Sequence, residues 1–233
     1  MILTTFAFTA CGLRIGTPEE YEFWGEPRWN VPAMSSPTTS VEISPPLPNP
    51  LPLKSGVMVV DPFTGSGNTL YWILHHLPGA HGMGLEQDPV VFQLTSRNLA
   101  ILNLSIAVSN LDYKAGLSIP NAAQDQLLIA FIAPPWGDAL NRGTGLDLRR
   151  TMPPISEIVE FLISIAGKCP LLCAIQVYET LDLTSVSELM PRFSWSTKRM
   201  YGLNAPGQNH GLLMGTRGWV PWSAAKADVQ SHD

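Results

Sequence analysis

The sequence predicts an α/β protein of Rossmann-like type, in which parallel strands alternate with helices. Two observations lead to this prediction. Short apolar runs rich in Val, Ile and Leu, such as 57–60 and 127–133, have the length and composition of strands buried on both faces. Segments with helical spacing of apolar residues separate such runs, and this alternation is typical of a parallel sheet covered by helices.

The first strand is predicted over residues 57–61, whose sequence is Val-Met-Val-Val-Asp. Pro62 follows it directly. Proline cannot donate a hydrogen bond to a sheet and keeps the residue before it extended. Asp61 is therefore expected at the end of the strand.

A glycine turn is predicted after this strand. Gly65 and Gly67 allow the backbone to turn tightly and to come close to a ligand. Asn68 or Thr69 is expected to cap the next helix. In an α/β sheet, a turn at this place commonly binds a nucleotide-like cofactor.

The later elements continue the alternation. Pro89 after Asp88 marks a helix start, and Ser156 is expected to cap a helix with an apolar stripe. The last two strands are expected to form an antiparallel hairpin that closes a seven-stranded sheet. In order, we predict a helix over 68–77, a strand over 81–86, a helix over 89–102, a strand over 106–113, a strand ending at 133, a Gly- and Arg-rich loop reaching 153–154, a helix over 156–168, a strand over 171–177, a short helix over 185–190, and strands over 193–200 and 211–216.

The residues of the glycine turn argue against two classes of nucleotide-binding site. A dinucleotide fingerprint needs a third glycine where Leu70 stands, so a nicotinamide enzyme is a distant alternative. A phosphate-binding loop ends in Gly-Lys-Ser/Thr, and no lysine occurs here. Asp61 would repel a pyrophosphate. Its carboxylate suits a ligand with a cationic end, such as the ammonium and sulfonium of S-adenosylmethionine (SAM).

A second acid supports the same cofactor. Glu86 ends the next predicted strand, about twenty residues after the turn, where a carboxylate commonly binds ribose hydroxyls. Two acids at adjacent strand ends therefore favour SAM. The residues expected to bind it are Asp61, Pro62, Phe63, Thr64, Gly65, Ser66, Gly67, Asn68, Glu86 and Gln87.

A second motif, Pro134-Pro135-Trp136-Gly137, directly follows the predicted strand that ends at residue 133. Together with Asp-Pro-Phe-Thr-Gly-Ser-Gly at 61–67, this tetrapeptide resembles the amino-directed class I methyltransferases, and most of all the RNA cap guanine-N2 type. The resemblance covers residues 57–136. It implies the seven-stranded class I sheet, SAM as cofactor, and methyl transfer to an amino or ring nitrogen of a nucleobase-type substrate, including one within RNA.

The chain departs from that family at two places. Ala133 stands where the family usually has Asp, Asn or Ser before Pro-Pro. Ala115-Gly116-Leu117 is the nearest match to the family's Gly-Asp-Phe, whose acid meets the adenine amino group; Asp112 is the substitute that we expect to bind the cofactor there.

Methyl transfer needs little from side chains at the second motif. The reaction is an in-line displacement, so the enzyme chiefly supplies orientation and distance. The carbonyl oxygens of Ala133 and Pro134 could accept hydrogen bonds from both N–H groups of an aromatic amine, and Trp136 could stack on a planar substrate. The expected catalytic residues are thus Ala133, Pro134, Pro135 and Trp136. The alternative is a rigid loop with a core tryptophan.

The net charge of the chain and the position of its arginines indicate which kinds of substrate it could bind. Fourteen Lys and Arg against nineteen Asp and Glu give a formal net charge of −5, which argues against extended contact with a nucleic acid. Arg142, Arg149 and Arg150 could still form a small anion-recognising patch, or simply be solvated surface charge. The substrate is therefore a nucleobase-type amine or, alternatively, a small planar heterocycle. A non-catalytic SAM-binding or scaffold domain also stays open.

Residues 1–55 form a predicted extension to a domain over 56–222, and a frayed tail is expected at 223–233. The extension contains an aromatic segment with Trp24 and Trp29 and then a proline-rich strap. The aromatic segment is either a lid that helps to bind substrate or a brace on the sheet. The expected substrate-binding residues are Trp24, Trp29, Trp136, Arg142, Arg149 and His210.

The remaining chemistry-bearing residues indicate no metal site. The five histidines lack metal-ligand spacing, and His75-His76 are expected at a helix C-terminus. Three cysteines cannot form a closed disulfide framework, and Cys169 and Cys173 are expected to be core thiols. The N-terminus lacks a basic segment before its apolar run, so a cytoplasmic location without a membrane span is expected, with the oligomeric state open.

Overall fold

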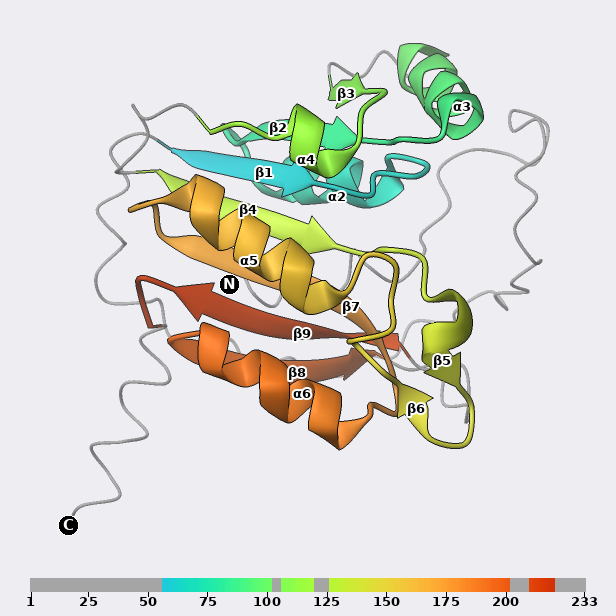
Figure 1. Cartoon of the computed structure of the whole chain (residues 1–233). Coiled ribbons are helices and arrows are strands. Elements are labelled where there is room, and N and C mark those ends of the chain that lie inside the picture. The colour runs from blue at the N-terminus through green and yellow to red at the C-terminus, as the bar shows by residue number, and fades with distance from the viewer. Residues whose placement is uncertain (1–55, 102–105, 120–125, 202–209, 221–233) are drawn as a thin grey trace, which may run out of the picture.

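A seven-stranded sheet organises the computed structural model, which describes residues 56–101, 106–119, 126–201 and 210–220 (Figure 1). The predictions for residues 1–55 and 223–233, including Trp24 and Trp29, lie outside the described residues. The strands run across the sheet in the order β3 (Ala107–Ser109), β2 (His81–Leu85), β1 (Val57–Asp61), β4 (Leu127–Ile132), β7 (Leu171–Tyr178), β9 (His210–Arg217) and β8 (Trp195–Tyr201).

The first five strands of this order are parallel, and the last two complete an antiparallel edge. β1 lies centrally, with Val60 opposite Met83 of β2 and Ala130 of β4. β9 pairs antiparallel with both β7 and β8. The predicted sheet with its closing hairpin is thus confirmed.

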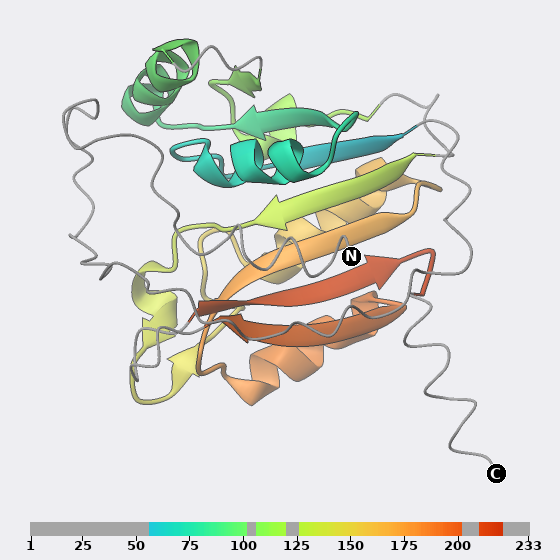
Figure 2. The same ribbon diagram turned by 180° about the vertical axis from the view of Figure 1, so that it is seen from behind.

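Helices cover both faces of the sheet. Figure 1 shows α4 (Tyr113–Gly116), α5 (Ile155–Ala166) and α6 (Leu183–Leu189) in front of the sheet, and Figure 2 shows α2 (Asn68–His76) on the other side. α3 (Pro89–Ile101) lies beyond the end of β2. The core is split accordingly: α5 packs with one cluster of buried side chains and α2 with a second.

α5 illustrates why these segments become helices. Its buried residues recur every three or four positions, so they form one stripe that faces the sheet. Ile158, Val159 and Leu162 are fully buried in that stripe. The helix begins at Ile155 after Pro154, and Ser156 lies inside its first turn, so the prediction that Ser156 caps it was wrong.

Two glycines of β2 allow the neighbouring segments to lie directly on the strand. A Cβ atom at Gly84 would lie 2.3 Å from Thr64 Oγ1, and one at Gly82 would lie 2.4 Å from Leu74 Cδ1 of α2. The absence of side chains at both positions lets the turn after β1, and α2 behind it, pack against β2.

The segment after β2 and α3 differs most from the prediction. The strand predicted over 106–113 is limited to β3, and Tyr113 begins the short helix α4. Asp112 caps that helix, because its side chain accepts a hydrogen bond from the Lys114 N–H at 2.9 Å. A side-chain cap competes with sheet pairing, which explains the early end of the strand.

Two other local details were also not predicted. The N-cap of α2 is Gly67 in a left-handed conformation (φ 75°), and not Asn68 or Thr69. The loop after β4 contains a helical turn, η2 (Gly137–Ala139), and a two-stranded ribbon of β5 (Leu140–Asn141) and β6 (Gly145–Leu146).

Two expectations about side chains are confirmed. His75 and His76 occupy the last turn of α2, as predicted. Cys169 and Cys173 are buried in the core, also as predicted, and burial raises the pKa of both thiols. Across the four described ranges, no helix has both the length and the apolar character that a membrane crossing needs.

Candidate active site

The site is built where the carboxyl ends of β1, β2 and β4 meet at one edge of the sheet. Parallel pairing places Asp61 opposite Gly84, so β1 and β2 end side by side. β4, on the other flank of β1, leads into Pro134 and Pro135. Strand ends of an open parallel sheet are where such folds commonly bind ligands.

The turn after β1 is held by hydrogen bonds to both neighbouring segments. The Thr64 N–H donates to the Leu85 carbonyl at 2.9 Å, and the Thr64 hydroxyl donates to the Asp61 carbonyl at 2.9 Å. The Thr95 hydroxyl of α3 donates to the Gly65 carbonyl. Gly65 and Gly67 both have positive φ (49° and 75°), which side-chain-bearing residues adopt only with strain.

Glu86 contacts this turn, although it follows the next strand along the chain. Its Oε2 accepts a hydrogen bond from the Gly65 N–H at 3.0 Å, and its Oε1 accepts one from the Asp88 N–H at 2.9 Å. The Asn110 side chain donates to the carbonyls of Glu86 and Gln87 at 2.8 and 3.1 Å. The carboxylate is thus fixed next to the glycine turn, and each oxygen keeps further acceptor capacity.

Asp61 is the most perturbed acid of the site. Its side chain is only 2% exposed, and its Oδ1 accepts a hydrogen bond from the Phe63 N–H at 3.2 Å. Burial raises the pKa of Asp61 to about 7; the Phe63 hydrogen bond opposes this rise, and the charge of Glu86 adds to it. A buried carboxyl of this kind gains a favourable interaction when a cation comes close.

The second motif forms a stiff segment after β4. Pro134 is buried and Pro135 exposed, while the flanking Ala133 and Trp136 are partly buried. Gly137 has φ 47° and starts the η2 turn, in which the Ala139 N–H donates to the Trp136 carbonyl at 2.9 Å. The prolines have no N–H groups, so local donors that could occupy the carbonyls here are few.

Trp136 belongs to a cluster of three aromatic rings. Its indole stacks on the imidazole of His210, with centroids 5.5 Å apart and planes 20° apart. Tyr178 meets both rings nearly edge-on, at 6.3 Å from Trp136 and 6.4 Å from His210. Burial lowers the pKa of His210, and the charge of Glu179 opposes this effect. The structure therefore unites Trp136 and His210, two of the predicted substrate-binding residues.

The structure also gives the positions of other predicted site residues. Asp112 is exposed, and its carboxylate caps α4. Ser66 and Gln87 are exposed next to the glycine turn. Phe63 packs on Tyr113 of α4, with ring centroids 5.5 Å apart. Arg142 is exposed in the turn between β5 and β6.

Arg149 is bound by carboxylates of this chain. Its guanidinium forms ion pairs with Asp147, Asp182 and Glu188 at 2.9, 3.2 and 3.1 Å. These hydrogen bonds raise the pKa of Arg149 and lower that of Asp147. Arg149 therefore ties the loop before α5 to α6, and this pairing reduces its capacity to bind an anionic ligand.

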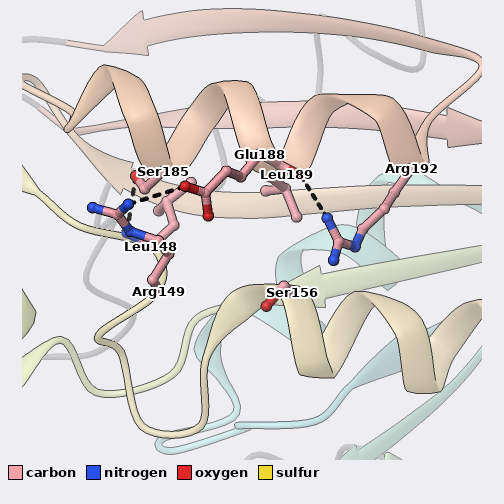
Figure 3. Close-up of a pocket in the computed structure, with 7 residues that line it drawn as sticks. All are labelled: Leu148, Arg149, Ser156, Ser185, Glu188, Leu189 and Arg192. Atoms are coloured by element: carbon pink, nitrogen blue, oxygen red, sulfur yellow. Dashed lines mark hydrogen bonds and ion pairs between the residues drawn. The ribbon is translucent and has the colours of Figure 1, made fainter.

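A pocket of about 310 Å³ also lies between α5 and α6 (Figure 3). Its two arginines are engaged within the chain: Arg149 as described, and Arg192 with Glu160 at 2.6 Å. It includes none of the strand-end motif residues, so we place the candidate site at the sheet edge instead. The pocket is lined by Leu148, Arg149, Ser156, Ser185, Glu188, Leu189 and Arg192.

Several residues of the site could not be identified from the sequence. Thr95, Asn110 and Tyr178 reach it from elements whose positions depend on tertiary packing, and none lies in a recognisable motif. For Gly84, the sequence shows only one of two glycines in a predicted strand. A glycine in a strand commonly marks a close approach by another part of the backbone. Within the described ranges, no cluster of three metal-binding side chains is present.

Comparison with known proteins places the fold. No family model and no curated protein matches the sequence. Among solved structures, the N-terminal domain of human METTL16 is similar with a TM-score of 0.52 and 15% identity, over 71% of this chain and 62% of that one. A Listeria monocytogenes protein, provisionally described as a class I SAM-dependent methyltransferase, is similar with a TM-score of 0.51 and 15% identity, over 72% of this chain and 55% of that one.

At this identity the similarity concerns the fold alone, and the chain matches less than two thirds of the length of either protein. The strand order and the closing antiparallel hairpin agree with that similarity. This chain has the fold of the class I SAM-dependent methyltransferases.

Proposed function

We propose that the chain is a SAM-dependent methyltransferase that acts on an amino or ring nitrogen of a nucleobase-type substrate. The observation that carries this proposal is the meeting of two acids at the glycine turn: Glu86 accepts a hydrogen bond from the Gly65 N–H, and Asp61 is buried directly before the turn. A turn with this charge suits a nucleoside whose other end is cationic.

The residues present fit that cofactor chemically. Glu86 offers acceptor positions for ribose hydroxyls, as a carboxylate after the second strand does in nucleotide-binding folds. Asp61 offers a negative charge for the ammonium of the methionine part, and Gly65 and Gly67 keep the approach to the backbone clear. When bound, SAM supplies an electrophilic methyl group on a sulfonium.

The chain's own task in the reaction is to orient the acceptor. The Ala133 and Pro134 carbonyls could accept hydrogen bonds from the two N–H groups of an aromatic amine. These hydrogen bonds would favour a more pyramidal nitrogen. Trp136 offers an aromatic surface for a planar ring, which is worth roughly 1–3 kcal/mol for a base. Transfer would form the N–C bond from the nitrogen lone pair as the S–C bond breaks, the bonding electrons would leave with the thioether product, and the proton of the methylated nitrogen would pass to solvent without a strong general base.

The net charge of −5 favours a small or locally recognised substrate over a long nucleic acid. Arg149, one of the three arginines of the predicted anion-recognising patch, is already paired with three carboxylates. A small planar heterocycle is therefore the second candidate substrate. A domain that binds SAM without turnover is the third candidate, because Ala133 provides no polar side chain before Pro-Pro.

Transfer of labelled methyl groups from SAM separates these candidates. We would offer total RNA, tRNA and a panel of small heterocyclic amines to the wild-type protein and to Asp61→Asn and Trp136→Ala variants that remain folded. The proposal predicts transfer to a nucleobase-type nitrogen that both substitutions abolish. Methylation confined to non-nucleobase small molecules would favour the second candidate, and SAM binding without transfer to any acceptor would favour the third. As the matched control, Trp195→Ala removes a tryptophan of β8, far from the glycine turn in the strand order, and should leave the transfer intact.

A further inference from the structure

The aromatic cluster at the ends of β4 and β7 contains a contact that sequence motifs do not explain. Trp136 stands on a loop, so the sheet does not by itself fix the plane of its indole. His210 is the first residue of β9, and it pairs across the sheet with Tyr178, the last residue of β7. Two rings on paired strands thus flank one ring on a loop.

The geometry of the three rings distinguishes His210 from Tyr178. The imidazole lies nearly parallel to the indole, with planes 20° apart, whereas Tyr178 meets the indole at 72°. A parallel ring covers one face of the indole, and an edge-on ring supports its side. Tyr178 is 5% exposed, while Trp136 is only partly buried and keeps some surface open.

We propose that His210 is a positioning residue of the acceptor site, whose imidazole holds the Trp136 indole so that its opposite face receives a planar acceptor ring. The inference rests on the proposed function, because it assigns the acceptor to the Trp136 side of the strand-end edge. It predicts a three-layer stack of imidazole, indole and acceptor.

The protonation state of His210 agrees with this role. Burial lowers its pKa, so the imidazole is neutral at pH 7 and above, although Glu179 acts in the opposite direction. The stack then consists of neutral rings. It therefore fits a neutral planar heterocycle such as an unmodified base better than it fits an anionic group.

The test follows the indole directly. The full-length protein is labelled with 5-fluorotryptophan, and the Trp136 signal among the seven tryptophans is assigned by its loss in Trp136→Phe. His210→Phe keeps a flat ring and His210→Ala removes it. His81→Ala, at an exposed histidine on β2, is the matched control. Adenosine and guanosine are then titrated into each protein in the presence of saturating S-adenosylhomocysteine.

In the wild-type, His210→Phe and His81→Ala proteins, we expect one Trp136 resonance that moves on addition of a nucleoside. In His210→Ala, the resonance should shift toward that of free 5-fluorotryptophan, and the nucleoside Kd should rise about tenfold, a loss within the range of one stacking contact. A Trp136 resonance in His210→Ala at its wild-type position would overturn the proposal. So would a His210→Phe protein that behaves like His210→Ala, or a wild-type resonance that neither nucleoside moves.

Failure of the proposed function is detected separately. Calorimetric titration of the same samples with S-adenosylhomocysteine reports the cofactor site, which His210 does not touch in the proposed arrangement. No binding by the wild-type protein would refute the cofactor assignment, while the Trp136 resonance in the unliganded variants would still decide whether His210 orients the indole.

Discussion

Replacement of Asp61 by asparagine should make the protein more stable, and increasingly so as the pH rises. Asp61 is 2% exposed and its pKa is about 7, compared with 3.8 for an unperturbed aspartate. Between these two values the folded state binds more protons than the unfolded state. The free energy of unfolding of the wild type therefore falls as the pH rises through this window, and the cost is fully present above it.

The magnitude follows from the two pKa values. Ionisation of this one carboxyl costs the folded state about 2 kcal/mol at pH 5 and about 4 kcal/mol at pH 7.5, relative to the fully protonated form. Asparagine has nearly the same shape, cannot ionise, and can still accept the hydrogen bond from the Phe63 N–H. The stability difference between Asp61→Asn and wild type should thus grow by roughly 2–3 kcal/mol over this pH range.

Urea unfolding of both proteins at pH 5 and pH 7.5 measures this difference. Asp138→Asn, at an exposed aspartate beyond the second motif, is the matched control and should show no such growth. An Asp61→Asn protein that loses stability relative to wild type as the pH rises would refute the reasoning. That result would mean that the ionised carboxylate is already stabilised inside the folded protein.

Three further substitutions test the packing around the site. Gly84→Ala places a Cβ 2.3 Å from Thr64 Oγ1, so the turn must move and the affinity for S-adenosylhomocysteine should fall about tenfold by calorimetry; Gly143→Ala, in an exposed turn, should bind like wild type. Leu162→Ala removes a fully buried side chain of α5 and should cost about 2–5 kcal/mol in urea unfolding, and a cost below about 1 kcal/mol would contradict its place in the core. Arg149→Met breaks exposed ion pairs, so the free energy of unfolding should change by about 1 kcal/mol or less, and an unchanged affinity for S-adenosylhomocysteine is expected; a lost affinity would place Arg149 in the site after all.

The sequence was sufficient to predict the sheet and the meeting of two acids at one edge of it, because both depend on local signals. Asp61 and Glu86 each follow an apolar strand, and the carboxyl ends of parallel strands share one edge, so their proximity could be inferred before any coordinates. In the structure, a hydrogen bond from the Gly65 N–H to Glu86 joins the turn that follows Asp61 to the end of the neighbouring strand.

Other features depend on tertiary register and could not be inferred. The pairing of Tyr178 with His210 follows from the antiparallel alignment of β7 and β9, which no local pattern specifies to the residue. The engagement of Arg149 by three carboxylates requires that the loop before α5 lie on α6. Asp112 was expected to bind the cofactor, and the capping of α4 by its carboxylate was not inferred.

Calorimetric titration with S-adenosylhomocysteine tests the central claim most directly, on the wild-type protein and on Asp61→Asn. The account predicts micromolar binding by the wild type, because Glu86 and the glycine turn are already in place, and loss of that binding in the folded Asp61→Asn variant. A well-folded wild type that shows no binding, or an Asp61→Asn variant that binds equally well, would contradict the assignment of the strand-end edge as a SAM site.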